Sequence, residues 1–366
     1  MQIERFLTLH PETFGLDLSD YSMKVAQLER SKGEFSLRSF GEFPLPNGAI
    51  ERGEIKKPEE LAARIIESLL KVQGKQISTP YVVASLPEEQ AFLQVIQLPR
   101  MKLEEVRDAV NFEAENYIPY EIDTVYLDYE VINPLRGPLD HLDILLAALP
   151  RDTVDPYLTV LEKAGLVPRA LEIESLAVSR AVVKEGISLT PLLIMDMGKT
   201  KTRLNVFAGS SLQFTTSLPI SGDQMTDAIA KTLEIPEKRA EDLKHHQGKE
   251  AKRVFEALIP TLTDLAEQVK KYMDYYASHA AHQHMEGTRM QIQKMLLCGG
   301  GASLQGLREF LASQLKVEVE LGNPWLNILS FPVRRTPPLS YLDSLPYTTA
   351  LGLALRAARA SSLSSL

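Results

Sequence analysis

Cysteine is almost absent from this chain of 366 residues, which contains only Cys298. A single cysteine excludes disulfide frameworks and zinc sites built from cysteines, and it is typical of proteins from a reducing compartment. Long hydrophobic runs are also missing. The longest, residues 142–149, ends at Pro150 and is far shorter than the roughly 18 residues that a membrane helix requires. The first residues lack the basic start and apolar core of a signal peptide. We therefore expect a cytoplasmic protein.

Positive charge is scarce as well, because 40 Lys and Arg residues stand against 48 Asp and Glu, which gives a net charge of −8. Nucleic acids and anionic membrane surfaces are bound through clustered Lys and Arg side chains. We therefore expect no nucleic acid as a partner and no direct membrane contact. The hydrophobic fraction of 44% is enough for a sizeable core. A chain of this length is expected to form about two to three domains.

The N-terminal part has the pattern of a small α/β lobe. Pro58 marks the start of an amphipathic helix whose apolar residues recur at helical spacing until Gly74. Polar turns separate short apolar runs, which predict strands at 14–18, 23–27, 35–43 and 81–86. We assign residues 1–87 to a first lobe, completed by residues 170–190 and by a C-terminal helix over 346–360.

Residues 88–169 have a different order of elements and are predicted to be an inserted subdomain. Strands are expected near 91–98, 125–132, 142–149 and 166–171, and helices over 102–117 and 152–164. This βαββαβ order typically folds into two layers, with both helices on one face of a single sheet.

The second half is predicted to be another α/β lobe, residues 191–345. Strands are expected across 192–207, at 214–218 and at 294–297, where the last strand runs into three glycines. A helical subdomain is expected over about 222–289, with Pro236 and Pro260 each marking a helix start.

The two halves share a strand, aspartate, turn and strand pattern, which suggests a duplication. Asp17 ends one apolar strand and is followed by a small polar turn, and Asp196 does the same in the second half. Such a repeat predicts two related domains that face each other across a ligand crevice. The turns offer backbone N–H groups and hydroxyls to phosphate oxygens, and the two aspartates could hold hydrated magnesium. The alternative is that each aspartate simply starts a turn.

Three consecutive glycines, Gly299, Gly300 and Gly301, follow the apolar strand at 294–297 and precede a helix. Glycine lets the backbone approach a nucleotide closely, as in other strand-to-helix phosphate turns. The sequence is neither a Walker P-loop nor a dinucleotide fingerprint. A tight connection without a ligand is the alternative.

These motifs together resemble those of the actin-like ATPases, and more closely the PilM family of type IV pilus assembly proteins, relatives of the cell-division protein FtsA. The three motifs are Phe14-Gly15-Leu16-Asp17, Asp196-Met197-Gly198 and Cys298-Gly299-Gly300-Gly301. The resemblance implies an α/β, actin-like two-lobed fold of duplicated ribonuclease H-like domains with an inserted βαββαβ subdomain. Other matching stretches are Glu113 to Tyr120, Glu162 to Leu166, Leu218 to Asp223, Ala240 to Lys244, Gly322 to Pro324 and Gly352 to Arg356.

The resemblance also implies ATP and Mg²⁺ as cofactors in the cleft, with Asp17 and Asp196 near the metal. Asp196 and Thr200 are the candidates for positioning a water, and the protein is expected to be at most a slow ATPase. The family usually has glycine at the position of Ser19, so we expect crowding or backbone strain there, with the bulky Tyr21 as a second intruder. The implied nucleotide-binding residues are Asp17, Ser19, Asp20, Tyr21, Ser22, Lys24, Gly198, Lys199, Thr200, Glu241, Lys244, Gly299, Gly300 and Gly301.

As a partner, the resemblance implies the N-terminal cytoplasmic peptide of the inner-membrane protein PilN, held in a groove between the first lobe and the insert. Other pilus inner-membrane and motor proteins would be linked through it, and the chain would be recruited to the inner face of the inner membrane. An FtsA-like division protein and a sugar or acyl kinase are the alternatives. The tail 361–366 is too short and polar for the membrane helix expected of FtsA.

Overall fold

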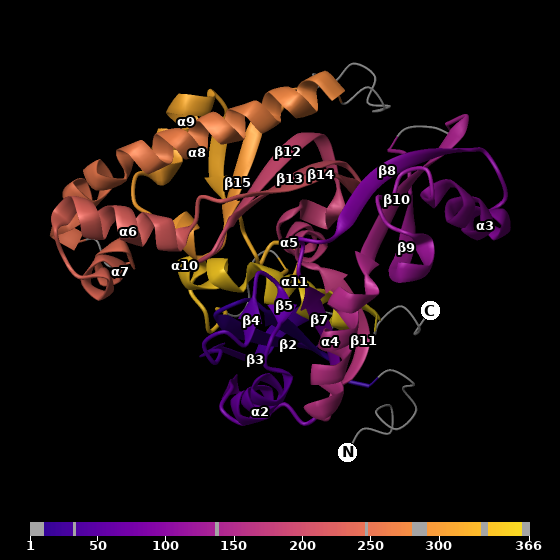
Figure 1. Cartoon of the computed structure of the whole chain (residues 1–366), viewed down its shortest axis with the longest axis horizontal. Coiled ribbons are helices and arrows are strands. Elements are labelled where there is room, and N and C mark those ends of the chain that lie inside the picture. The colour runs from indigo at the N-terminus through magenta and orange to yellow at the C-terminus, as the bar shows by residue number, and fades with distance from the viewer. Residues whose placement is uncertain are drawn as a thin grey trace.

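The computed structural model describes residues 11–31, 34–135, 139–245, 248–279, 291–330 and 336–360. Two lobes, each built on a mixed β-sheet, lie one above the other, with a smaller sheet beside them (Figure 1). The C-terminal tail, residues 361–366, is outside the described residues, as is the end of the predicted helical subdomain, 280–289. Within the described residues, no helix combines the length and apolar character needed to cross a membrane.

Lobe I contains a sheet of order β11-β7-β1-β2-β3-β6. Strand β1 is antiparallel to β2, and β2 is antiparallel to β3, whereas β7 is parallel to both β1 and β11. Its strands are β1 (Phe14–Leu18), β2 (Ser22–Ser31), β3 (Glu34–Pro44), β6 (Gln73–Gly74), β7 (Tyr81–Leu86) and β11 (Val167–Ile173). A small hairpin of β4 (Ile50–Glu51) and β5 (Glu54–Ile55) lies beside this sheet.

Helices cover both faces of the lobe I sheet because alternate residues of the buried strand β1 point to opposite sides. Phe14 and Leu16 share a core with α2 (Pro58–Leu69) and α4 (Arg151–Lys163). On the other face lies α11 (Thr348–Ala360), so close that a Cβ on Gly15 would be 2.6 Å from the carbonyl oxygen of Ala350. This glycine of the first motif is therefore required by helix packing.

Lobe II repeats the topology of lobe I, with strand order β14-β13-β12-β15-β16. Two antiparallel pairings, β12 with β13 and β13 with β14, are again followed by two parallel ones, β12 with β15 and β15 with β16. The same order and directions in both halves agree with the predicted duplication. The strands are β12 (Ser188–Met197), β13 (Thr202–Gly209), β14 (Ser211–Leu218), β15 (Lys294–Cys298) and β16 (Glu318–Leu321).

Helices of lobe II pack on one face of its sheet and share its main core. They are α6 (Gly222–Leu233), α7 (Glu237–His245), α8 (Ala251–His279) and α9 (Leu307–Leu315); the short α10 (Tyr341–Ser344) precedes α11. The predicted helix start at Pro260 is wrong, because α8 continues through this residue. On the other face of the sheet lies α5 (Glu174–Val182). It crosses α11 so closely that a Cβ on Gly352 would be 1.9 Å from the carbonyl oxygen of Ala177.

The insert is smaller than predicted. It consists of β8 (Phe92–Pro99), α3 (Leu103–Ala114), β9 (Val125–Ile132) and β10 (His141–Pro150), with sheet order β8-β10-β9 and α3 on its core. The predicted single βαββαβ sheet is wrong, because β11 pairs with β7 and α4 packs on the core of lobe I. Strand β7 is almost completely buried, and its backbone groups on that edge need a partner, which β11 supplies.

Candidate functional site

A cavity of about 500 Å³ is lined by both lobes. The Asp-containing hairpins of the two sheets and the glycine turn after β15 all contribute to its wall. The structure thus brings together every residue predicted for the site. These are Asp17, Ser19, Asp20, Tyr21, Ser22, Lys24, Asp196, Gly198, Lys199, Thr200, Glu241, Lys244, Gly299, Gly300 and Gly301.

Ser19 closes the turn of the first hairpin. Its backbone N–H and its hydroxyl both donate to the carbonyl oxygen of Ser22, at 3.0 and 2.8 Å. Ser19 is not among the non-glycine residues with positive φ in the described part of the chain, so the predicted backbone strain is not found. The Ser19 hydroxyl therefore has a structural partner within the turn.

Asp20 and Tyr21, the middle residues of this turn, have different surroundings. The Asp20 carboxylate accepts hydrogen bonds from the backbone N–H groups of Arg52 and Gly53, at 3.2 and 3.0 Å. It therefore anchors the β4–β5 hairpin to the turn. The half-exposed ring of Tyr21 faces the other lobe, and the Lys199 ammonium lies 4.5 Å from its centroid. This cation–π contact joins the two hairpin turns across the cavity.

The second hairpin turn is held by the first residues of α6. Gly198 donates its N–H to Lys201, and its own carbonyl oxygen accepts from the N–H of Gly222 at 3.0 Å. The carbonyl oxygen of Lys199 accepts from Asp223 at 2.9 Å. These bonds fix the turn that carries Lys199 and Thr200 against lobe II.

The three glycines have unequal roles. Gly299 has a φ of +80°, and a Cβ there would lie 2.5 Å from Oδ1 of Asp196 and 2.6 Å from the carbonyl oxygen of Met197. A Cβ on Gly301 would lie 2.9 Å from the Cβ atom of Met197. Gly299 and Gly301 are therefore required by close packing of β15 against β12. A Cβ on Gly300 would meet nothing nearer than Pro346 at 4.0 Å, so the cavity wall is open at this residue.

Glu241 and Lys244 connect α6 with α7. The Lys244 ammonium, which is almost fully buried, donates to the carbonyl oxygen of Gly222 at 2.8 Å and to Oγ1 of Thr226 and Oε2 of Glu241 at 2.7 Å. A hydrogen bond from His245 is the main cause that holds the pKa of the Glu241 carboxyl well below its usual range. Both residues line the cavity, and their role in nucleotide binding stays a prediction.

Asp17 is the buried carboxylate of the lobe I hairpin. Its exposed fraction is 7%, and its Oδ1 atom has no hydrogen-bond partner. Burial raises the pKa of this carboxyl, and the charges of Lys24 and Arg203 oppose the rise. Lys24 itself donates to Ser22 at 3.1 Å and pairs with Glu42 at 3.2 Å. Asp17 is thus a buried acceptor next to cations, with one oxygen unused.

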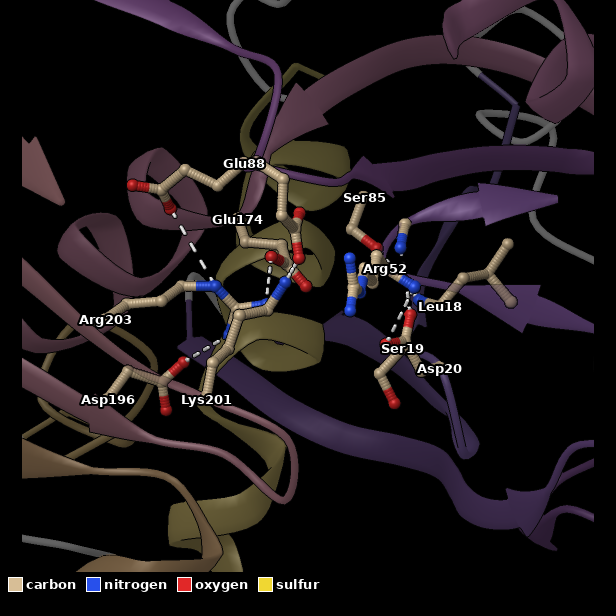
Figure 2. A network of polar contacts seen from close by, with 12 residues as sticks. Leu18, Ser19, Asp20, Arg52, Ser85, Glu88, Glu174, Asp196, Lys201 and Arg203 are labelled. Atoms are coloured by element: carbon tan, nitrogen blue, oxygen red, sulfur yellow. Dashed lines mark hydrogen bonds and ion pairs between the residues drawn. The ribbon is translucent and has the colours of Figure 1, made fainter. Parts of the chain in front are cut away.

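Arg203 is the centre of a charge network that the sequence analysis did not predict (Figure 2). Its Nη1 atom lies 3.2 Å from Oδ2 of Asp196, its Nη2 forms an ion pair with Glu174, and its Nε is 4.0 Å from Glu88. Lys201, which directly precedes β13, forms an ion pair with Glu89. These contacts connect lobe II to α5 and to the segment that leads into the insert.

Burial dominates the electrostatics of this network. It raises the pKa of Glu88 to about 7 and that of Glu174 to about 8, although Arg203 acts in the opposite direction on both. Burial and the charge of Arg203 lower the pKa of Lys201 to about 8. Near neutral pH the two glutamates are therefore partly protonated, so the network around Arg203 is less negative than its composition suggests.

Two sequence signals could have identified this network. Glu174 directly follows strand β11, and Asp17 and Asp196 stand near the ends of β1 and β12, so each of the three carboxylates lies at the carboxyl end of a strand in its own sheet. Asp196 and Arg203 are opposite each other in the β12–β13 hairpin. The short turn of a hairpin fixes which residues of its two strands are opposite each other.

The family model of the type IV pilus assembly protein PilM matches residues 15–358, which include both lobes, the insert and every residue of the cavity wall. The chain belongs to the PilM family. The family match confirms the resemblance inferred from the three motifs.

The chain is also similar to solved structures and to curated proteins. A structure described as the "PilM-PilN type IV pilus biogenesis complex" is 28% identical, with a TM-score of 0.76, and the match covers 95% of this chain and 99% of that one. Cell division protein FtsA of Streptococcus pneumoniae is 23% identical over 344 residues, 85% of this chain and 75% of FtsA. MreB 5 of Spiroplasma citri bound to AMPPNP matches 97% of this chain and 98% of its own at 12% identity, with a TM-score of 0.53. This likeness establishes the actin-like fold.

The cavity fits a nucleoside triphosphate better than it fits a metal held by protein alone. Its volume lies within the range of small-molecule sites, and Lys24, Lys199 and Arg203 supply positive charge for phosphates. In the described residues, no group of three or more His, Cys, Asp or Glu side chains forms a potential metal cage. Asp17 has an unused oxygen for a hydrated ion, whereas Asp196 is paired with Arg203.

Proposed function

We propose that this chain is an ATP-binding scaffold of the type IV pilus machinery, which docks the N-terminal cytoplasmic peptide of PilN. Membership of the PilM family supports the assembly role, and the similar structure of a PilM–PilN complex supports the partner. Through PilN, the chain is recruited to the inner face of the inner membrane, where other pilus inner-membrane and motor proteins assemble.

The single structural observation behind nucleotide binding is that two equivalent hairpins, one from each lobe, line the same cavity. In this proposal, the turns around Ser22 and Thr200 bind the phosphates, and Glu241 and Lys244 lie on the adenosine side. Magnesium, when bound, would neutralise phosphate charge and would be held by water, the phosphates and Asp17, with Asp196 as the second predicted ligand.

Slow turnover is consistent with the arrangement of charges. A carboxylate, Gln or Thr must position a water for in-line attack on the terminal phosphate. Of the two predicted candidates, Asp196 is ion-paired with Arg203, and Thr200 offers a hydroxyl. We therefore propose that bound ATP stabilises the closed cleft and is hydrolysed slowly, if at all.

The proposed docking region for the PilN peptide is the junction between the insert and lobe I. In the described insert, β9 is an edge strand next to α4, and an extended peptide can add to such an edge. Tyr126 of β9 donates a hydrogen bond to Asp155 of α4 at 2.8 Å, and the Arg151 guanidinium lies 4.3 Å from the centre of its ring. This half-exposed aromatic side chain is the best-placed anchor for a peptide.

A calorimetric titration with the PilN N-terminal peptide, with and without ATP and Mg²⁺, tests the proposal. We expect saturable binding to the wild type, and Tyr126→Ala should weaken it by about 10-fold. Phe112→Ser is the matched control, because Phe112 is an exposed aromatic residue on α3 of the same insert. Absence of peptide binding in both conditions would contradict the assembly role. A kinase would instead release ADP faster when a sugar or an acid is supplied.

A further inference from the structure

Tyr21 and Lys199 line the cavity from different lobes and contact each other. Tyr21 belongs to the hairpin turn of lobe I and Lys199 to that of lobe II, and the ammonium lies 4.5 Å from the centre of the ring. Each backbone is fixed within its own lobe. The carbonyl oxygen of Tyr21 accepts a hydrogen bond from the N–H of Leu45 at 2.8 Å, and that of Lys199 accepts from Asp223 at 2.9 Å. The contact therefore depends on how the two lobes are placed relative to each other.

Lys199 differs from the other lysines of the cavity wall in its partners. The others form ion pairs with glutamates: Lys24 with Glu42, Lys201 with Glu89, and Lys244 with Glu241. Among the residues that the structure describes, Lys199 makes neither an ion pair nor a side-chain hydrogen bond. Its charge opposes the rise that burial causes in the pKa of Asp223, but the two groups do not pair. The charge of Lys199 is therefore available to a phosphate.

An aromatic ring can order an ammonium group without neutralising it. The negative face of the ring attracts the cation, but the ring has no net charge, so Lys199 keeps its own. An ammonium has three N–H groups, and those that point away from the ring can donate to phosphate oxygens. A lysine side chain that is already ordered also loses less rotamer freedom when it binds a ligand.

Tyr21 makes this contact with its ring alone. The residue is 44% exposed, and its hydroxyl has no hydrogen-bond partner in the part of the chain that the structure describes. The sequence analysis expected a bulky intruder at this position of the turn. The structure instead places the ring against the one cavity lysine, of those described, that lacks a carboxylate partner.

We propose that Tyr21 is a positioning residue, which holds the Lys199 ammonium over its ring so that Lys199 meets the nucleotide phosphates already ordered and still charged. This inference rests on the proposed function, because it requires phosphates in the cavity; the contact between ring and ammonium does not. Since the two side chains come from different lobes, Lys199 is ordered in this way only while the lobes stay as close as they are here.

Calorimetric titration of ATP with Mg²⁺ into variants of the two residues tests the proposal. Tyr21→Leu removes the ring, and we expect it to bind ATP about 5-fold more weakly, which is the size of a cation–π contact at a partly exposed site. Tyr21→Phe keeps the ring and should bind ATP as the wild type does. In the Lys199→Met background, Tyr21→Leu should cause no further loss. Tighter binding by Tyr21→Leu, an equal loss in Tyr21→Phe, or an equal loss in the Lys199→Met background would overturn the proposal.

Tyr81→Leu is the matched control for loss of a cation–π contact. The Arg169 guanidinium lies 5.6 Å from the centre of the Tyr81 ring, and neither residue lines the cavity. We expect the ATP affinity of this variant to equal that of the wild type, and a loss as large as that in Tyr21→Leu would overturn the proposal. Because Tyr21 is a half-exposed turn residue, its variants should fold, which urea unfolding checks.

A second measurement needs no nucleotide. Lysines that carry ¹³C-labelled methyl groups keep their charge, and their methyl signals in NMR spectra respond to nearby aromatic rings. The Lys199 signal, assigned by its absence from Lys199→Met, should be shifted upfield in the wild type and in Tyr21→Phe, but not in Tyr21→Leu. An identical signal in the wild type and Tyr21→Leu would overturn the proposal. If the wild type binds no ATP, the proposed function fails, while the NMR experiment still decides whether the ring holds Lys199.

Discussion

Replacement of Glu88 by glutamine should make the protein less sensitive to alkaline pH. Glu88 is 6% exposed, and burial raises its pKa from 4.5 to about 7. Since the folded protein holds this proton more tightly than the unfolded chain does, the stabilisation is complete below about pH 4.5 and is lost as the pH rises through about 7. A shift of this size corresponds to roughly 3 kcal/mol of unfolding free energy.

Urea unfolding between about pH 5 and pH 8 measures this effect. Glu88→Gln should become more stable relative to the wild type by up to about 3 kcal/mol across this range, because the wild type must ionise a buried carboxyl and the variant does not. Glu54→Gln is a suitable control, since Glu54 is fully exposed and its contact with Lys56 lowers its pKa. If the stability difference between Glu88→Gln and wild type does not change with pH, the electrostatic account of the network is incorrect.

Two further predictions concern packing and charge. Gly352→Ala should lower the unfolding free energy by more than about 3 kcal/mol, because the new Cβ would clash with the α5 backbone at Ala177; urea unfolding with an unchanged midpoint would contradict the α5–α11 crossing. Lys24→Met should lower ATP affinity by about 10-fold in calorimetry, because a charged contact is lost from the cavity wall. Equal affinity in the two proteins would remove Lys24 from the nucleotide site.

The sequence was informative where function depends on short local patterns. Each hairpin and the glycine turn consist of neighbouring residues, so the strand pattern and the turn residues identified them before any contact was known. The repeated pattern also predicts that the two lobes face each other, since two related domains commonly form a ligand crevice between them. The cavity wall therefore contains every predicted residue.

The sequence was less informative where distant segments compete for the same partner. The order of elements along the chain suggests that β11 belongs to the insert. That order does not show which sheet has an unpaired edge strand, and in the structure β11 pairs with β7 of lobe I. The charge network likewise joins three segments that are distant in the sequence, and they come together only when both lobes are folded. These segments carry Glu88, Glu174 and Arg203. Pro260 was misread because the helix tolerates it while the surrounding residues stay packed.

The most direct test of the central claim, that the cavity between the lobes binds ATP, is a calorimetric titration of ATP into wild type and Gly300→Leu. A Cβ at Gly300 would meet no atom nearer than Pro346 at 4.0 Å, and Gly300 lines the cavity, so we expect the variant to fold. The account predicts binding by the wild type and an affinity at least about 10-fold lower in the variant, with equal urea midpoints. Equal ATP affinity in both proteins, or no binding by the wild type, would contradict it.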